Sequence, residues 1–196
     1  MTHPQQLSAT TEEEREALKS LARGCKSAVD IGTFRGGTAH CLLEVMPEGY
    51  VWTIDTFDGR SGGETITSWP REQLIKDVLN NLKEFDGRFA LAVGESSAVS
   101  RVFHDRSIDL VFIDGAHDYN SVDRDIEHWI EKVREGGIIC GHDYEKRMRY
   151  IPDECYEQHA HLDCCLEHNC HPGVIKAVDK WFELVKTCNS LWWTRL

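Results

Sequence analysis

The sequence lacks a long apolar run, a basic leader segment and any excess of positive charge. No stretch is apolar over the length needed to cross a bilayer, and residues 1–11 are polar and then acidic, unlike a signal peptide. We therefore expect a cytoplasmic protein with no membrane partner. The chain has 22 Lys and Arg against 33 Asp and Glu, a net charge of −11. This balance argues against nucleic acid as a partner, because phosphate backbones attract basic surfaces.

Internal repeats and low-complexity linkers are also missing, so we interpret residues 1–196 as a single domain. Apolar runs and helical patterns alternate along the chain. This βαβ order predicts an α/β fold, a Rossmann-like doubly wound sheet of about seven mostly parallel strands with helices on both faces. The expected strands are 28–32, 50–56, 89–93, 108–114 and 138–142, and the expected helices are 37–46, 69–84, 96–104 and 119–134.

Three segments depart from this alternation. A capping box, in which Glu follows Thr by three positions, predicts an N-terminal helix over about residues 11–23. Residues 145–171 are rich in Cys and His and show no clean periodicity, so we expect an insertion with one short helix. An apolar stripe over 172–185 predicts a last helix, and a turn at 189–190 predicts an antiparallel edge strand, 191–195.

The chain lacks the Gly-x-Gly-x-x-Gly fingerprint of dinucleotide-binding proteins. The apolar run 28–31 breaks instead into Gly-x-x-x-Gly-Gly, from Gly32 to Gly37, and a helical pattern starts near Thr38. This order predicts a strand, a tight turn and a helix N-terminus, which lets the backbone approach a nucleotide closely. Asp30 would repel a pyrophosphate and attract the cationic amino group of a methionine moiety. The pattern favours S-adenosylmethionine over NAD, and an ordinary βα turn without a ligand is the alternative.

Polar side chains follow the next two expected strands. Asp55 lies at the end of the strand 50–56, where a carboxylate can accept hydrogen bonds from ribose hydroxyls. Glu95 and Ser96 follow the strand 89–93, where an adenine amino group could be held. Capping of the next helix by Ser96 or Ser97 is the alternative.

Acidic residues and histidines follow the last two parallel strands. Asp114 ends one strand and His142 with Asp143 follows its neighbour, so two carboxylates and an imidazole are expected at one edge of the sheet. Two carboxylates repel each other unless a cation or a proton intervenes, and a divalent metal is one solution. Oxygen ligands suit Mg²⁺, whereas imidazole suits Mn, Fe, Ni or Zn. In the alternative, Asp143 caps a loop and His142 packs in the core.

His117 follows Asp114 by three residues and is expected in the loop over the same site. A histidine there can accept a proton from a hydroxyl near neutral pH. A structural or solvated histidine is the alternative.

Together these motifs resemble the class I S-adenosylmethionine-dependent methyltransferases, in particular the macrocin O-methyltransferase-like and catechol O-methyltransferase-like groups. The resemblance covers residues 25–144 and resumes over 171–196. It rests on five segments that occur in the family's order, namely 30–38, 53–55, 111–119, 136–144 and 171–179.

The resemblance implies a set of cofactor-binding residues: Asp30, Gly32, Gly36, Thr38, Asp55, Glu95, Ser96 and Asp114. The first three would shape the methionine pocket, and Thr38 would cap the adjacent helix. Asp55 would hold the ribose, and Glu95 with Ser96 would hold the adenine.

The resemblance also implies catalytic and metal positions. Asp114, His142 and Asp143 fall on the metal positions of the metal-dependent members, and His117 falls on the general base. Those members usually carry Asp-Asp or Asp-Asn where this chain has His142-Asp143. Metal dependence, with Mg or Mn, is therefore a hypothesis, and the pair could instead orient the acceptor without a metal.

Paired Cys-x-x-Cys spacings are absent, yet four of the eight cysteines and four histidines crowd into residues 155–171. Thiolates and imidazoles suit zinc, so one interpretation is a separate structural zinc site at Cys155, Cys164, Cys165 and Cys170. The other main interpretation is a metal-free lid over the acceptor site. Disulfides are disfavoured in a reducing cytosol.

We therefore predict an enzyme that moves the methyl group of S-adenosylmethionine to a hydroxyl of a small-molecule acceptor, such as a sugar, a catechol-like compound or a natural product. Its acceptor pocket is expected from loop 57–67, the segment 145–171 and the N-terminal helix. An NAD-dependent oxidoreductase and a non-catalytic S-adenosylmethionine-binding protein stay open as alternatives. Trp192 and Trp193 suit either a core or an interface, so a homodimer is open as well.

Overall fold

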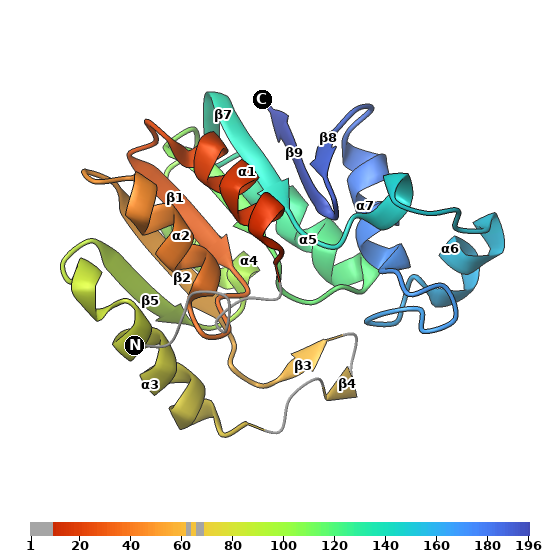
Figure 1. The fold of residues 1–196 in the computed structure, drawn as a ribbon, viewed down its shortest axis with the longest axis horizontal. Helices are drawn as coiled ribbons and strands as arrows, with labels where there is room; N and C mark the ends of the chain where they lie inside the picture. Colours follow the sequence, from red (N-terminus) through yellow and green to blue (C-terminus); the bar gives the residue numbers. More distant parts are fainter. Residues whose placement is uncertain (1–9, 62–63, 66–68) are drawn as a thin grey trace.

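The computed structural model describes residues 10–61, 64–65 and 69–196. Figure 1 shows one central sheet flanked by helices, with a small separate hairpin, β3–β4, beside it. The sheet has seven strands in the order β5-β2-β1-β6-β7-β9-β8. The first five are parallel and the last two are antiparallel. The predicted Rossmann-like sheet with an antiparallel C-terminal edge is confirmed.

The strands of the sheet are β1 (Ser27–Ile31), β2 (Tyr50–Asp55), β5 (Phe89–Val93), β6 (Ile108–Ile113), β7 (Val133–Gly141), β8 (Lys186–Cys188) and β9 (Leu191–Arg195). The hairpin is formed by β3 (Arg60–Ser61) and β4 (Glu64–Thr65). The helices are α1 (Glu12–Ala22), α2 (Gly37–Val45), α3 (Arg71–Asn81), α4 (Ser96–Val99), α5 (Tyr119–Ile130), α6 (Asp153–His159) and α7 (Pro172–Trp181). None of the helices in the described ranges is long and apolar enough to span a membrane.

Two apolar clusters, one on each face of the sheet, form the core. Helices α1, α2 and α3 cover one face, where Leu42 and Val78 are fully buried. Helices α5 and α7 cover the other face, around Trp129 and Ile175. Alternate residues of β6 enter each cluster, which explains why this central strand is nearly continuously apolar.

The strand register aligns the carboxyl ends of four strands. Ile31 of β1 pairs with Ile54 of β2 on one side and with Ile113 of β6 on the other. Ile113 pairs in turn with Gly141 of β7. The residues that end or follow these strands therefore lie along one edge of the sheet: Gly32, Asp55, Asp114 and His142.

The boundary between α5 and β7 differs from the prediction. The expected helix 119–134 is too long, and the strand expected at 138–142 begins at Val133. Val133 is buried and pairs with Ile108 of β6, so it belongs to the sheet. The early start has no apolar signal, because residues 134–136 are exposed.

Two further predicted helices end too late. The helix expected at 96–104 is α4 and a 3-10 turn, and Phe103 after it is extended, with its ring against Trp129. The stripe 172–185 stays helical only to the end of α7, because Phe182 is extended and leads into β8. In both cases an aromatic side chain continues the apolar pattern after the helix has ended.

The region between β2 and β5 differs as well. The helix expected at 69–84 begins only after Pro70 and ends in a 3-10 turn, Lys83–Phe85. The polar loop 57–67 contains β3 and β4, while residues 62–63 and 66–67 lie outside the described residues. The segment 145–171 carries one short α-helix, α6, as expected, and also a 3-10 turn, Glu145–Arg147.

Candidate active site

The turn after β1 passes too close to β6 for any side chain at Gly32. A Cβ atom there would lie 1.9 Å from the carbonyl oxygen of Asp114, and Gly32 has φ +85°. Gly36 has the same φ and forms the N-cap of α2. Thr38 was expected to cap this helix, but it lies inside α2 because the left-handed Gly36 starts the helix earlier. The turn brings bare main chain to the sheet edge, as nucleotide-binding turns do.

Asp30 is a buried carboxylate directly before this turn. Its side chain is fully buried, and neither carboxylate oxygen has a hydrogen-bond partner in the described part of the chain. The nearby Thr33 hydroxyl donates to main-chain carbonyls instead, at 3.2 Å to Asp30 and 3.4 Å to Ile54. Burial and the charge of Asp114 raise the pKa of Asp30 to about 7. An unpaired buried carboxylate of this kind fits a cationic ligand group.

Asp55 fastens the glycine turn to the end of β2. One carboxylate oxygen accepts a hydrogen bond from the amide of Phe34 and the other from the amide of Phe57, both at 2.7 Å. Burial raises the pKa of Asp55. Asp55, which was expected to hold a ribose, thus also holds the loop after β1 and the loop after β2 in place.

Ser96 and Glu95 lie at the end of β5, as expected, but Ser96 does not cap α4. The N-cap is Glu95, which makes no capping bond with its side chain and is exposed. The Ser96 hydroxyl donates instead to Asp125 of α5, a buried acid that the sequence did not single out. Burial raises the pKa of Asp125 to about 7.

His117 lies among three carboxylates beyond the end of β6. Its Nε2 is 3.2 Å from Asp143 and 3.6 Å from Asp114, and its Nδ1 is 2.9 Å from Asp163. Burial opposes the charged imidazole, but these carboxylates outweigh it and hold the pKa of His117 well above its usual range. Asp163 comes from the segment after α6 and was missed at the sequence level.

Asp143 is the carboxylate that these histidines share. It lies 3.1 Å from Nδ1 of His142, 3.4 Å from Nδ1 of His171 and 3.2 Å from Nε2 of His117. Its φ of 63° is in the left-handed region, so the chain turns sharply after β7 to present it. Burial opposes ionisation, but the surrounding imidazoles hold the pKa of Asp143 well below its usual range.

His142 connects the site to the N-terminal helix. Its Nε2 lies 3.0 Å from the Ser190 hydroxyl and 3.2 Å from Glu14, while its Nδ1 faces Asp143. Burial works against protonation, but Asp143 and Glu14 raise the pKa of His142 to about 11. Glu14 is the acid of the predicted capping box, accepting from the Thr11 amide at 2.7 Å, and its reach to His142 was not foreseen.

His171 closes the cluster from the start of α7. Its Nδ1 lies 2.7 Å from Glu145, and its ring centroid is 4.9 Å from that of His117. Two overlapping groups have a geometry that could hold a metal ion: the set Asp114, His142 and Asp143 that the sequence suggested, and the set His117, Asp143 and His171. His171 was present in the motif 171–179, but only the folded chain brings it to Asp143.

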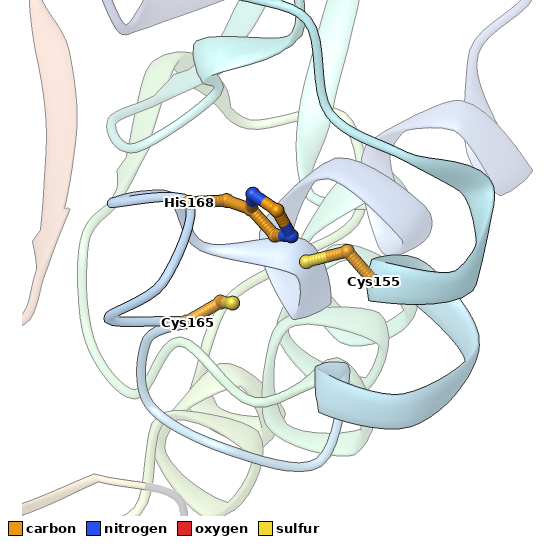
Figure 2. Close-up of side chains that lie close together, drawn as sticks. All are labelled: Cys155, Cys165 and His168. Atoms are coloured by element: carbon orange, nitrogen blue, oxygen red, sulfur yellow. The ribbon is translucent and has the colours of Figure 1, made fainter.

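The second Cys and His cluster differs from its prediction. Cys155 and Cys165 lie together with His168, and their ligand atoms are within 4.8 Å of one another (Figure 2). Cys170 is paired with Cys165 through main-chain hydrogen bonds. Cys164 is not a member of the group: it is only partly buried, whereas its neighbour Cys165 is buried.

Comparison with solved structures supports the fold. A putative caffeoyl-CoA O-methyltransferase from Staphylococcus aureus matches with a TM-score of 0.66 at 14% identity, over 96% of this chain and 85% of that chain. The O-methyltransferase TomG from Streptomyces achromogenes, in complex with SAM, matches with a TM-score of 0.62 at 14% identity, over 95% of this chain and 80% of that chain. At such low identity the likeness concerns the fold.

Comparison with curated sequences gives a distant relative. The chain is 25% identical over 123 residues to the uncharacterized protein y4gI of Sinorhizobium fredii, which is 61% of this chain but 13% of that protein. The chain thus spans a small part of the length of this relative.

A family model described as a methyltransferase domain matches residues 29–144, which is more than half of the chain and includes the glycine turn, Asp55, Asp114 and the His142–Asp143 pair. The matched segment contains the parallel strands of the sheet and the candidate cofactor turn. The chain therefore belongs to this methyltransferase domain family.

Proposed function

We propose that this protein transfers the methyl group of S-adenosylmethionine to a hydroxyl oxygen of a small molecule. When bound, S-adenosylmethionine would supply a methyl carbon on its sulfonium: the acceptor oxygen would bond to this carbon as the carbon–sulfur bond breaks in line, and S-adenosylhomocysteine would leave. The protein's contribution is then to bind both reactants side by side and to remove the hydroxyl proton. Two O-methyltransferases among the similar folds support oxygen as the acceptor atom.

The residues at the carboxyl ends of β1 and β2 fit the cofactor. The unpaired carboxylate of Asp30 suits the amino group of the methionine moiety, and Gly32 leaves the main chain bare beside it. Asp55 keeps further lone pairs on both oxygens for ribose hydroxyls. Glu95 and Ser96 at the end of β5 are left for the adenine.

His117 is the proposed general base. Its Nδ1 is held by Asp163, so its Nε2 faces Asp114 and Asp143 at the sheet edge. A carboxylate on one ring nitrogen fixes the tautomer and leaves the other nitrogen for proton transfer. Asp114 borders both Gly32 and His117, so the cofactor turn and the base are neighbours. This juxtaposition is the observation that carries the proposal.

Asp114, His142 and Asp143 are the proposed ligands of a divalent metal. A metal there supplies positive charge that lowers the pKa of an acceptor hydroxyl. The donor set fits, because Nε2 of His142 is engaged by Glu14 and Ser190 while Nδ1 faces Asp143. A carboxylate behind a histidine is the usual support of a metal-ligating imidazole.

A methyl-transfer assay with candidate acceptors tests the proposal. Purified protein is incubated with radiolabelled S-adenosylmethionine and a panel of sugars, catechols and other hydroxylated compounds, each paired with its deoxy analogue. We expect label in a hydroxylated compound and none in its deoxy partner. Transfer to amines alone would contradict oxygen as the acceptor, and binding of NAD in preference to S-adenosylmethionine would favour the oxidoreductase alternative.

A further inference from the structure

A second cluster of metal-ligating side chains lies away from the sheet edge, between α6 and the turn that precedes α7. Cys155 projects from α6, while Cys165 and His168 come from the following loop, and Figure 2 shows the three side chains pointing toward a common centre. Their sulfur and nitrogen atoms all lie within 4.8 Å of one another. Cys155 and Cys165 are each only 2% exposed, so both sulfurs are shielded from water, while His168 is partly exposed at the edge of the cluster.

Two further donors border this group. Nδ1 of His159, one turn after Cys155 on α6, lies 3.7 Å from the Cys155 sulfur and 3.1 Å from the Cys165 sulfur. Cys170 is fully buried and lies opposite Cys165 in the same small hairpin. Cys165 and Cys170 also exchange two main-chain hydrogen bonds, of 2.8 and 3.3 Å, which close the loop into a tight hairpin.

We infer that this cluster is a structural zinc site, with Cys155, Cys165 and His168 as ligands and a fourth ligand from Cys170 or His159. Zinc prefers four thiolate and imidazole ligands in a tetrahedron, and closed, buried sites of this kind are structural. Zn–S bonds of about 2.3 Å and Zn–N bonds of about 2.0 Å put tetrahedral ligand atoms about 3.3 to 3.8 Å apart. The observed cluster needs only small side-chain movements to reach this geometry.

The proposed zinc site affects the sheet edge, because two residues of the candidate active site flank the hairpin from Cys165 to Cys170. Asp163, which holds Nδ1 of His117, lies two positions before Cys165. His171, which contacts Asp143 and Glu145, directly follows Cys170. A zinc ion therefore fixes the loop that supports His117. Asp163 and His171 act here as positioning residues.

Metal analysis of the untagged, reduced protein is the first test. Because the sheet edge could also take zinc, wild type and Asp143→Asn are measured in parallel. We expect about one zinc per chain in both, and an absorption band of thiolate-to-cobalt charge transfer after replacement by Co²⁺. A wild-type protein that holds neither zinc nor cobalt overturns the inference. A disulfide between two of these cysteines in protein as first purified, without reductant or chelator, detected by mass spectrometry together with the absence of zinc, overturns it as well.

Matched variants test the ligand set. Cys165→Ser and His168→Ala should lose zinc, whereas Cys164→Ser should retain it, and at least one of Cys170→Ser and His159→Ala should lose it. Circular dichroism verifies that each variant is folded. If a variant is not folded, the zinc content of the wild-type protein decides the test. Zinc retained by Cys165→Ser but lost by Cys164→Ser contradicts this assignment.

Hydrogen exchange tests the coupling without relying on the proposed reaction. Removal of zinc from wild type by a chelator should increase amide exchange at least several-fold over residues 160–171 and leave the central strands unchanged. Unchanged exchange over 160–171 after zinc has been removed would show that the metal does not hold this loop.

Discussion

Among single residues, Asp143 organises the candidate active site. Three histidines approach its carboxylate, and each is held from behind by another acid: His117 by Asp163, His142 by Glu14 and His171 by Glu145. The imidazoles are therefore oriented before any ligand binds. Such pre-orientation is what a proton-transfer or metal site requires, because misplaced groups lose most of their effect.

His117→Ala removes the proposed base. We expect kcat to fall about 10²- to 10⁴-fold, the usual contribution of a general base, while the Kd for S-adenosylhomocysteine changes little. Steady-state kinetics and calorimetry on the same preparation measure the two quantities. If kcat is untouched, another group takes the proton. Loss of bound metal together with activity would make His117 a ligand rather than a base.

Asp163→Asn keeps the size of the side chain and an oxygen toward Nδ1 but removes the charge that favours the imidazolium. A base works only when neutral, so activity rises with pH as His117 loses its proton. Because the carboxylates raise the pKa of His117, this rise lies at high pH in wild type. We expect the variant's rise in kcat/KM to move by roughly one unit to lower pH. An unmoved pH profile in the variant contradicts the role of Asp163.

At the scale of helices and strands, the cluster depends on three elements that join the sheet edge from outside. Helix α1 brings Glu14, the segment after α6 brings Asp163, and the start of α7 brings His171. Glu14 is only 2% exposed and also accepts from the amide and hydroxyl of Ser190, at 2.9 and 2.8 Å. The N-terminal helix is thus fastened to both His142 and the β8–β9 turn.

Glu14→Gln should reduce stability in a pH-dependent way. Hydrogen bonds and the charge of His142 hold the folded-state pKa of Glu14 well below its usual range, although burial opposes this. A carboxylate with such a depressed pKa stabilises the folded protein at pH values above the pKa of about 4.5 that Glu has in the unfolded chain. This stabilisation is lost as the pH falls through the lower pKa of the folded state. The pKa of His142 is raised to about 11, so its protonated ring also stabilises the folded protein. This contribution is fully present below pH 6.5 and declines as the pH rises toward 11.

Thermal unfolding from pH 3 to 10 measures this dependence. The difference in Tm between wild type and Glu14→Gln should be largest between about pH 5 and 6.5 and should shrink toward both extremes. Glu13→Gln, on the same helix, is the matched control. A difference that does not vary with pH would mean that Glu14 acts through packing alone.

The arrangement of helices and strands determines how much of the site the sequence could predict. The common position of Asp114, His142 and Asp143 at one sheet edge was predictable, because β6 and β7 are apolar runs whose carboxyl ends must meet there. The early start of β7 was not, because its pairing with Ile108 leaves residues 134–136 exposed. Nor were Glu14, Asp163 and His171, because their contacts depend on how irregular segments pack.

In the whole molecule, the sheet carries the candidate cofactor turn, whereas the segment after β7 supplies residues that orient the histidines of the candidate active site. The sheet and its glycine turn are set by local patterns, so the fold was predictable from the sequence. The choice between a metal-assisted and a metal-free site depends on the donors that converge on Asp143. The acceptor pocket and a homodimer stay predictions.

Chelation tests the metal hypothesis on the complete protein. We expect EDTA treatment to abolish most activity and Mg²⁺ or Mn²⁺ to restore it, with Asp143→Asn not rescued. Measuring zinc in the same samples separates this effect from the cluster at Cys155. Full activity after chelation, with no metal left in the protein, would leave the donors at the sheet edge as acceptor-orienting groups only.

Calorimetric titration of wild type and Asp30→Lys with S-adenosylmethionine and S-adenosylhomocysteine measures cofactor binding most directly. We predict one binding site per chain for both compounds in wild type, and binding weakened at least tenfold in the variant, where a cation replaces the unpaired carboxylate beside Gly32. Absence of any binding heat with properly folded wild type would rule out the proposed cofactor site, as would equal affinity in the folded variant.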